Sequence, residues 1–154
     1  MTKQDCLSVM VIDSSALIAI FCDEPERPDF NRQIAAASRR LISTASVLET
    51  SIVLENRYGE EAYRELDFFL LKAAIHIYPF DAEQLEIARR AYRQYGKGRR
   101  ALERTDFRKA KGEPLQRLAG LNYGDCFSYA LAKHTGEPLL FKGNDFSQTD
   151  IDCC

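Results

Sequence analysis

Residues 7–21, LSVMVIDSSALIAIF, place a short apolar strand directly before a helix, with one aspartate between them. The run 7–12 is rich in apolar and β-branched residues and predicts a buried strand that stops at Asp13. Ser14 and Ser15 can cap the helix that we expect over residues 16–21. This strand–helix step sets the pattern that the rest of the chain repeats.

The alternation of strands and helices continues along the 154 residues. Further strands are predicted at 41–42, 75–78 and 138–141, and helices at 29–38, 44–59, 60–74, 81–95 and 122–135. Short apolar strands separated by helices are typical of a mostly parallel sheet with helices on both faces. We therefore expect a single α/β domain over residues 1–154, a three-layer α/β/α sandwich.

Composition excludes several classes of protein. The chain is 45% hydrophobic and 29% charged, with a formal net charge of -2, which is typical of a globular protein and argues against charge-driven coating of nucleic acid. No apolar run approaches the ~20 residues that a membrane-spanning helix needs, and the start has no secretory signal pattern. The five cysteines form no C-x-x-C pair, which favours reduced thiols and a cytoplasmic protein over a disulfide framework or a zinc site.

A basic segment interrupts this organisation. Residues 97–117 hold eight basic and three acidic side chains, so the rest of the chain is acidic although the total charge is close to zero. Phosphate contacts from such a segment supply non-specific affinity for nucleic acid. A solvated loop explains the composition equally well. The candidate nucleic-acid contacts are Arg99, Arg100, Arg104, Arg108, Lys109 and Lys111.

Two acidic residues follow predicted strands. Asp13 comes directly after the first strand, and Asp145 lies in the loop after the last one. Ligands of open α/β sheets bind outside the carboxyl ends of the strands, so these aspartates are candidates for one site. Each alone is also explained as a turn former or a helix cap. Asp150 is the nearest rival of Asp145.

Two further acids fall on predicted helices. Glu49 lies inside the apolar stripe that we expect its helix to bury, formed by Ala45, Leu48, Ile52 and Val53. A buried carboxylate without a basic partner is costly, so it should be paired, protonated or bound to a cation. Asp125 opens an apolar helix, where the helix dipole favours an anion and Asn122 can complete a capping box. Four converging carboxylates suggest a site for Mg²⁺ or Mn²⁺.

The chain resembles the PIN-domain ribonucleases, and among them the VapC-type toxins of bacterial type II toxin–antitoxin pairs. Four blocks carry the resemblance in the family's order: MVIDSSAL (10–17), SVLET (46–50), NYGDCFSYALA (122–132) and LFKGNDF (140–146). Family members commonly begin at the equivalent of Met10, which makes residues 1–9 a candidate N-terminal extension. The stretch before Asn122 is about a dozen residues longer than the family pattern, which makes residues 97–118 a candidate basic insertion.

The resemblance implies a metal-dependent endoribonuclease with the PIN-like sandwich fold. Asp13 and Asp125 would be the principal Mg²⁺ or Mn²⁺ ligands, Glu49 would hold a metal or orient its water, and Asp145 would complete the site. The hydroxyls of Ser14 and Ser15 would support the site, although helix capping also explains them. The implied products carry a 5′ phosphate and a 3′ hydroxyl.

The resemblance also implies partners besides the RNA substrate. VapC-type toxins pair with a cognate antitoxin, are usually homodimers, and form hetero-oligomers with the antitoxin. The implied antitoxin groove would be lined by Leu17, Phe21 and Phe30, which are equally plausible as core. The helix over 63–73 is a candidate dimer surface, although burial inside one chain is the simpler interpretation. Two other functions stay open: an inactive PIN module that binds RNA or a protein, and a phosphatase with Asp13 as nucleophile, although Ser15 stands where that chemistry usually has a second aspartate.

Overall fold

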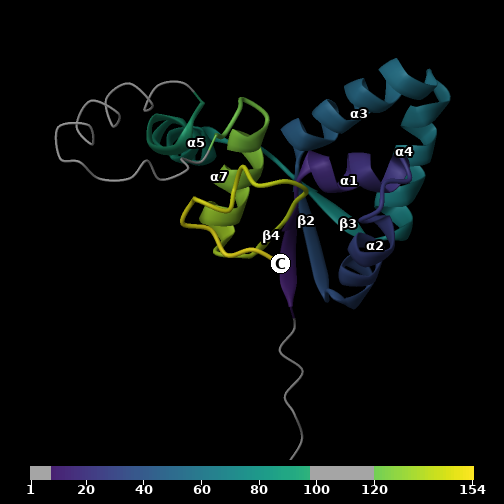
Figure 1. Ribbon diagram of the computed structural model, residues 1–154, viewed down its shortest axis with the longest axis horizontal. Coiled ribbons are helices and arrows are strands. Elements are labelled where there is room, and N and C mark those ends of the chain that lie inside the picture. Colours follow the sequence, from purple (N-terminus) through teal and green to yellow (C-terminus); the bar gives the residue numbers. More distant parts are fainter. Residues whose placement is uncertain (1–7, 98–119) are drawn as a thin grey trace, which may run out of the picture.

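The computed structural model describes residues 8–97 and 120–154 of the chain. Within these residues, four parallel strands form one sheet in the order β3-β2-β1-β4 (Figure 1). The strands are β1 (Val9–Ile12), β2 (Arg39–Ser43), β3 (Ile75–Tyr78) and β4 (Leu139–Leu140). The helices are α1 (Ser14–Phe21), α2 (Arg27–Ala36), α3 (Thr44–Tyr58), α4 (Glu61–Lys72), α5 (Ala82–Tyr95) and α7 (Asp125–Thr135). The predicted order of these elements is confirmed.

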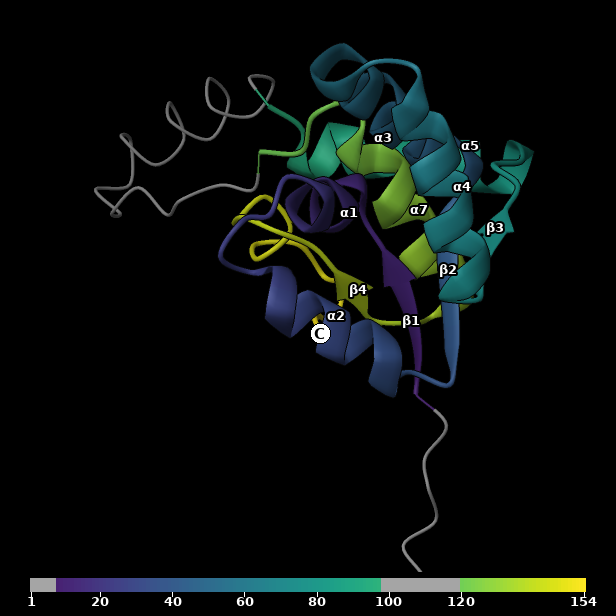
Figure 2. The same cartoon turned by 90° about the vertical axis from the view of Figure 1, so that its right-hand side faces the viewer.

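Helices cover both faces of the sheet. Successive residues of a strand point to opposite faces, so a single strand contributes side chains to two cores. Met10 and Ile12 pack into a core with residues of α1, α2 and α4. Val11, between them, packs into a second core with residues of α5 and α7. Figure 1 shows α5 and α7 on one side of the sheet, and Figure 2 turns the side that carries α1 to α4 toward the viewer. The three-layer α/β/α sandwich is therefore confirmed.

The strand order reverses between β1 and β4. From β1 the chain adds β2 and then β3 on one side, and β4 later joins on the other side. Ile12 is in register with Leu140, and the backbone N–H of Asp13 donates to the carbonyl of Leu140 at 2.9 Å. Open α/β sheets bind ligands at such a switch point, outside the carboxyl ends of the strands. Asp13 stands at this position.

The helix ends follow most of the predicted caps. The Asp81 carboxylate accepts a hydrogen bond from the backbone N–H of Gln84 at 2.9 Å at the start of α5. Gly59 and Gly136 end α3 and α7 with φ of 83° and 74°, which glycine adopts without a Cβ penalty. The prediction that Ser14 or Ser15 caps α1 was wrong. Asp13 is the capping residue, and both serines belong to the first turn.

The predicted surface for an antitoxin needs a correction. Leu17 and Phe30 are fully or almost fully buried in the core beneath α1 and α2, so they line no open groove, and only Phe21 is partly accessible. On α4, Leu66 and Leu70 are core residues, whereas Leu71 is exposed.

None of the helices in the described parts of the chain is long and apolar enough to cross a membrane.

Candidate active site

Asp13 is the most deeply buried acid of the candidate site. It ends β1 and caps α1, where its Oδ2 accepts a hydrogen bond from the backbone N–H of Ser15 at 3.0 Å. Its Oδ1 is buried and has no hydrogen-bond partner among the described residues. Burial raises the pKa of Asp13, and the nearby hydroxyl of Ser128 and the first turn of α1 offset this only in part. A buried carboxylate oxygen without a hydrogen-bond partner is energetically costly, and a bound cation would stabilise its negative charge.

Glu49 reaches the site from α3, but not from a buried stripe. The prediction that Leu48 and Ile52 are buried was wrong, because their exposures are 61% and 48%. The helix instead buries Ser46, Thr50 and Leu54. The small side chain of Ser46 lets α3 approach α7, where its hydroxyl lies 3.1 Å from that of Ser128.

Because α3 buries the face that carries Ser46, Thr50 and Leu54, Glu49 is half-buried at the edge of the site. Its Oε2 accepts a hydrogen bond from the Ser14 hydroxyl at 2.8 Å, so the first turn of α1 holds this carboxylate close to Asp13. Burial raises the pKa of Glu49, and the negative charge of Asp13 raises it further. Glu49 thus lies near Asp13, as predicted. The predicted cause, a buried stripe that contains Leu48 and Ile52, was wrong.

Asp125 is fixed by a reciprocal pair of hydrogen bonds. The Asn122 side chain accepts from the backbone N–H of Asp125 at 2.9 Å, and the Asp125 carboxylate accepts from the backbone N–H of Asn122 at 2.8 Å. The predicted capping box is thus present. Burial raises the pKa of Asp125 to about 6, with further raising contributions from Asp13, Asp145 and Glu49 that the Asn122 N–H offsets in part. Asp125 therefore lies close enough to the other three predicted acids for their negative charges to raise its pKa.

Asp145 lies in the loop that follows β4, on the same edge of the sheet. The backbone N–H of Lys142 donates to the Ser15 hydroxyl at 2.9 Å, which ties the start of this loop to α1. The Lys142 ammonium also pairs with Glu24 and Glu26 in the turn after α1. Ser15 therefore positions the loop of Asp145, a role that its place in the sequence does not reveal.

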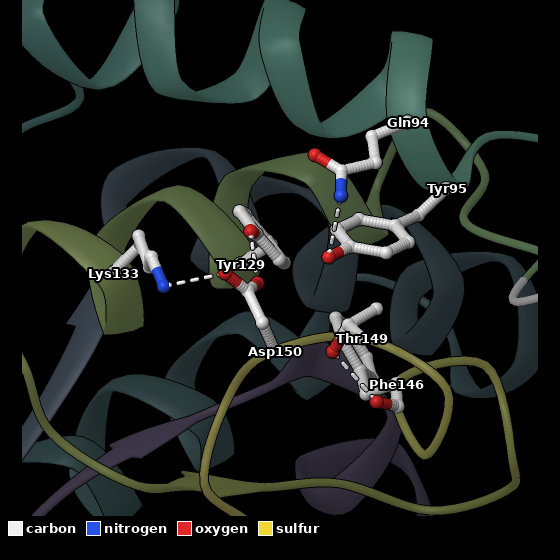
Figure 3. A network of polar contacts seen from close by, with 7 residues as sticks. All are labelled: Gln94, Tyr95, Tyr129, Lys133, Phe146, Thr149 and Asp150. Atoms are coloured by element: carbon white, nitrogen blue, oxygen red, sulfur yellow. Dashed lines mark hydrogen bonds and ion pairs between the residues drawn. The ribbon is translucent and has the colours of Figure 1, made fainter.

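Asp150, the rival of Asp145, is engaged elsewhere (Figure 3). It accepts hydrogen bonds from the Tyr129 hydroxyl at 2.5 Å and from the Lys133 ammonium at 2.7 Å. Burial opposes ionisation of Asp150, but these two hydrogen bonds outweigh it and hold its pKa below the usual range. Asp150 thus fastens the C-terminal segment to α7, and Asp145 is the better candidate for the site.

The four predicted acids, Asp13, Glu49, Asp125 and Asp145, are here called the acidic cluster. None of its members forms an ion pair with a basic side chain in the described part of the chain. Residues 8–97 and 120–154 contain no three His, Cys, Asp or Glu side chains close enough to hold a metal among themselves. Mg²⁺ commonly binds one or two carboxylates and completes its octahedron with water and phosphate oxygens, so a small set of protein ligands is compatible with it.

Gly124 is a site residue that sequence reasoning missed. A Cβ at this position would lie 2.4 and 2.6 Å from the two carboxylate oxygens of Glu49. Its φ of -64° and ψ of -39° are helical, so the backbone does not require glycine. The close approach of Glu49 is therefore what excludes a side chain. Only the Asn-Tyr-Gly-Asp block hinted at this residue.

The candidate RNA contacts Arg99, Arg100, Arg104, Arg108, Lys109 and Lys111 lie outside the described residues. The described residues that flank this segment, Lys97 and Gly120, lie close to each other. Lys97 and Leu121 form a backbone hydrogen bond of 3.0 Å, and Tyr95 forms a second one with Leu121. A Cβ on Gly120 would be 3.8 Å from the Asp145 carboxylate, so both ends of the basic segment lie beside the acidic cluster.

Comparison with known proteins adds an independent line of evidence. The family model described as "PIN domain" matches residues 10–152. Ribonuclease VapC30 of Mycobacterium tuberculosis is 51% identical over 142 residues, which cover 92% of this chain and 95% of that protein. Ribonuclease VapC of Mycolicibacterium smegmatis is 50% identical over 142 residues, covering 92% and 97%.

Solved structures with similar folds have much lower sequence identity. Mycobacterium tuberculosis VapC20, titled a Sarcin-Ricin loop cleaving toxin, has a TM-score of 0.63 at 18% identity, covering 92% of this chain and 95% of that one. DNA-bound VapBC from Salmonella typhimurium has a TM-score of 0.60 at 15% identity, covering 95% and 96%. At these identities the likeness concerns the fold.

Proposed function

The chain belongs to the PIN-domain family of VapC-type ribonucleases, and we propose that it cleaves RNA with divalent metal ions held by its acidic cluster. The observation that carries the proposal is the buried Oδ1 of Asp13, which makes no hydrogen bond to a described residue although the Ser128 hydroxyl lies nearby. Two of the nearby acids, Glu49 and Asp125, have a raised pKa, so their negative charges are poorly compensated by the protein itself. Mg²⁺ or Mn²⁺ supplies that compensation.

We assign each carboxylate a role from its position. Asp13 and Asp125 are the principal ligands because they are the most buried acids of the cluster. Glu49, held by the Ser14 hydroxyl, is placed to accept a proton from the attacking water or to bind a metal. Asp145 completes the site from the loop that follows β4. When bound, the metal lowers the pKa of water and neutralises charge that develops on the scissile phosphate.

The protein around these acids keeps them in place during the reaction. Ser14 holds Glu49, Ser15 holds the loop of Asp145, and Asn122 holds Asp125. Such positioning is worth several orders of magnitude in rate for phosphoryl transfer. The expected reaction is in-line attack of water on an internal phosphodiester, which leaves a 5′ phosphate and a 3′ hydroxyl. The residues of the basic segment would contact the RNA backbone on either side of the cut.

We also propose that the cognate partner is an antitoxin that binds between α2 and α4. A cavity of about 420 Å³ opens there beside Ile34 and Phe69, and a second of about 350 Å³ next to it is lined by Phe21. Charged side chains, Arg40 and Lys72 among them, line these cavities beside the apolar ones, which suits an amphipathic peptide segment. With the same family in view, we propose homodimers and hetero-oligomers with the antitoxin, in the cytoplasm.

The test is cleavage of total RNA by the purified protein in Mg²⁺ or Mn²⁺. We expect Asp13→Asn and Asp125→Asn to abolish cleavage while their thermal unfolding stays cooperative. Asp67→Asn, at an exposed position on α4, is the matched control and should cleave normally. Full activity of both site variants would overturn the proposal. A wild-type protein that binds RNA without cutting it would instead identify an inactive PIN module.

A further inference from the structure

Tyr123 is an exposed aromatic residue at the entrance of the acidic cluster. It stands between Asn122 and Gly124, and it is 80% exposed. Its ring contacts that of Phe127 edge-to-face, with centroids 4.9 Å apart at 90°. Phe127 in turn contacts Phe80, with centroids 4.8 Å apart. One edge of this aromatic row is therefore supported by the protein, while most of the Tyr123 ring faces solvent.

The same ring forms a ridge between two cavities. One cavity, of about 300 Å³, is lined by Tyr123, Phe127 and the Glu49 carboxylate together with the exposed Leu48 and Ile52 of α3. The other, of about 480 Å³, is lined by Tyr123, Phe127, Arg89 and Arg93 of α5. A molecule lying across the ridge would meet Glu49 on one side and, on the other, Arg93 together with Arg89, which pairs with Glu86 at 2.6 Å.

We propose that Tyr123 is a stacking platform for one base of the RNA substrate, next to the phosphate that is cleaved. The inference rests on the proposed function and adds a nucleobase subsite to it. Bases of single-stranded RNA stack on exposed aromatic rings, whatever their identity, because every base has a π-face. Arg89 and Arg93 are placed to contact the phosphate of the adjoining nucleotide.

The geometry favours a nucleotide over an apolar peptide at this surface. The cavity on the α5 side combines aromatic rings with two arginines, a combination that recognises a base and its phosphate together. The cavity on the α3 side is lined by Glu49, so an occupant of that cavity lies beside a member of the acidic cluster. Within the described residues, the Tyr123 hydroxyl makes no hydrogen bond to the protein, so the phenol is not holding the fold together at this point.

Binding of a short single-stranded RNA by fluorescence anisotropy tests the subsite. The measurements use the Asp13→Asn background, in which the RNA stays uncut. We expect Tyr123→Leu to weaken binding roughly 5- to 150-fold, the range for loss of one base–aromatic stack, and Tyr123→Phe to retain affinity. Tyr58→Leu is the matched control, because Tyr58 is an exposed tyrosine of α3 about 13 Å along the helix from Glu49.

A series of RNAs with one abasic nucleotide at successive positions separates stacking from other effects. With Tyr123 present, one abasic position should cost about as much affinity as Tyr123→Leu does. In the Tyr123→Leu protein, the same abasic position should cost nothing further. Equal losses from the abasic nucleotide in both proteins would overturn the stacking proposal.

Two further outcomes are informative. If Tyr123→Leu lowers the mass of the assembly in sedimentation, the ridge is an interface between copies of the chain and the subsite proposal is wrong. The binding cycle is independent of turnover, so absence of RNA cleavage by the wild-type protein would count against the proposed function alone. Unchanged RNA affinity in Tyr123→Leu would overturn the subsite even if cleavage is observed.

Discussion

Replacement of Gly124 by alanine should uncouple activity from stability. The added methyl would lie 2.4 and 2.6 Å from the Glu49 carboxylate oxygens, whereas ordinary contacts begin near 3.4 Å. The carboxylate must therefore move by about 1 Å, and the side chain of Glu49 is long enough to do so without disturbing α3. The hydrogen bond of 2.8 Å from Ser14 to Glu49 would be lost or bent in the process.

The two expected effects have opposite signs. A displacement of about 1 Å in a positioned group can lower a rate about 100-fold, so kcat for RNA cleavage should fall by about 10- to 100-fold. Gly124 precedes α7 with φ and ψ that alanine adopts without strain, and replacing glycine at such a position adds about 0.4–1 kcal/mol of stability through the unfolded chain. The free energy of unfolding should therefore stay level or rise slightly.

The assay combines single-turnover cleavage with urea unfolding of the same preparations. Gly120→Ala is the control, since a Cβ there meets the Lys97 side chain only at 3.4 Å or beyond. Glu49→Gln and the double variant with Gly124→Ala should lose similar activity, because both changes act through one carboxylate. Full cleavage by Gly124→Ala, or a rate loss that adds fully to that of Glu49→Gln, would refute this reasoning.

Three further predictions follow from the hydrogen bonds and charges of the site. Asn122→Ala removes the cap on the Asp125 backbone N–H and should lower the free energy of unfolding by about 1 kcal/mol, measured by urea denaturation, with a loss of cleavage. Because the folded pKa of Asp125 is about 6, above its unfolded value, metal-free wild type should lose stability as the pH rises from about 4 through about 6. Asp125→Asn should then be more stable than wild type at pH 7.5 in chelator, and a gain that does not shrink toward pH 4 would contradict the assignment. Asp145→Asn should impair cleavage, whereas Asp150→Asn should cleave normally and lose no more than about 1 kcal/mol of stability, since its ion pair is half-exposed; the reverse order of activities would exchange their roles.

Much of the fold could be predicted from local sequence. Short apolar strands such as 7–12, and helices bounded by residues such as Asp81 and Gly136, carry their signals within one short stretch. The capping box of Asn122 and Asp125 was also readable, because both partners lie three residues apart. These features need no knowledge of what packs against them.

The orientation of α3 could not be read in the same way. Its apolar residues at 45, 48, 52 and 53 predict a buried face, yet the helix packs through Ser46 and Thr50 because small side chains allow the close approach of α7. Leu48 and Ile52 are left exposed beside Glu49, and Ala45 and Val53 are half-buried. The ion pair that engages Asp150, the rival of Asp145, likewise depends on a distant partner, Lys133, which only the folded chain brings near.

Analysis of the end groups of RNA cleaved by the purified protein tests the central claim most directly. Attack by a water held at Asp13 and its neighbours predicts fragments with a 5′ phosphate and a 3′ hydroxyl. The fragments should be absent with chelator and with Asp13→Asn. Fragments that end in a 2′,3′-cyclic phosphate, or cleavage that persists in chelator, would contradict the account.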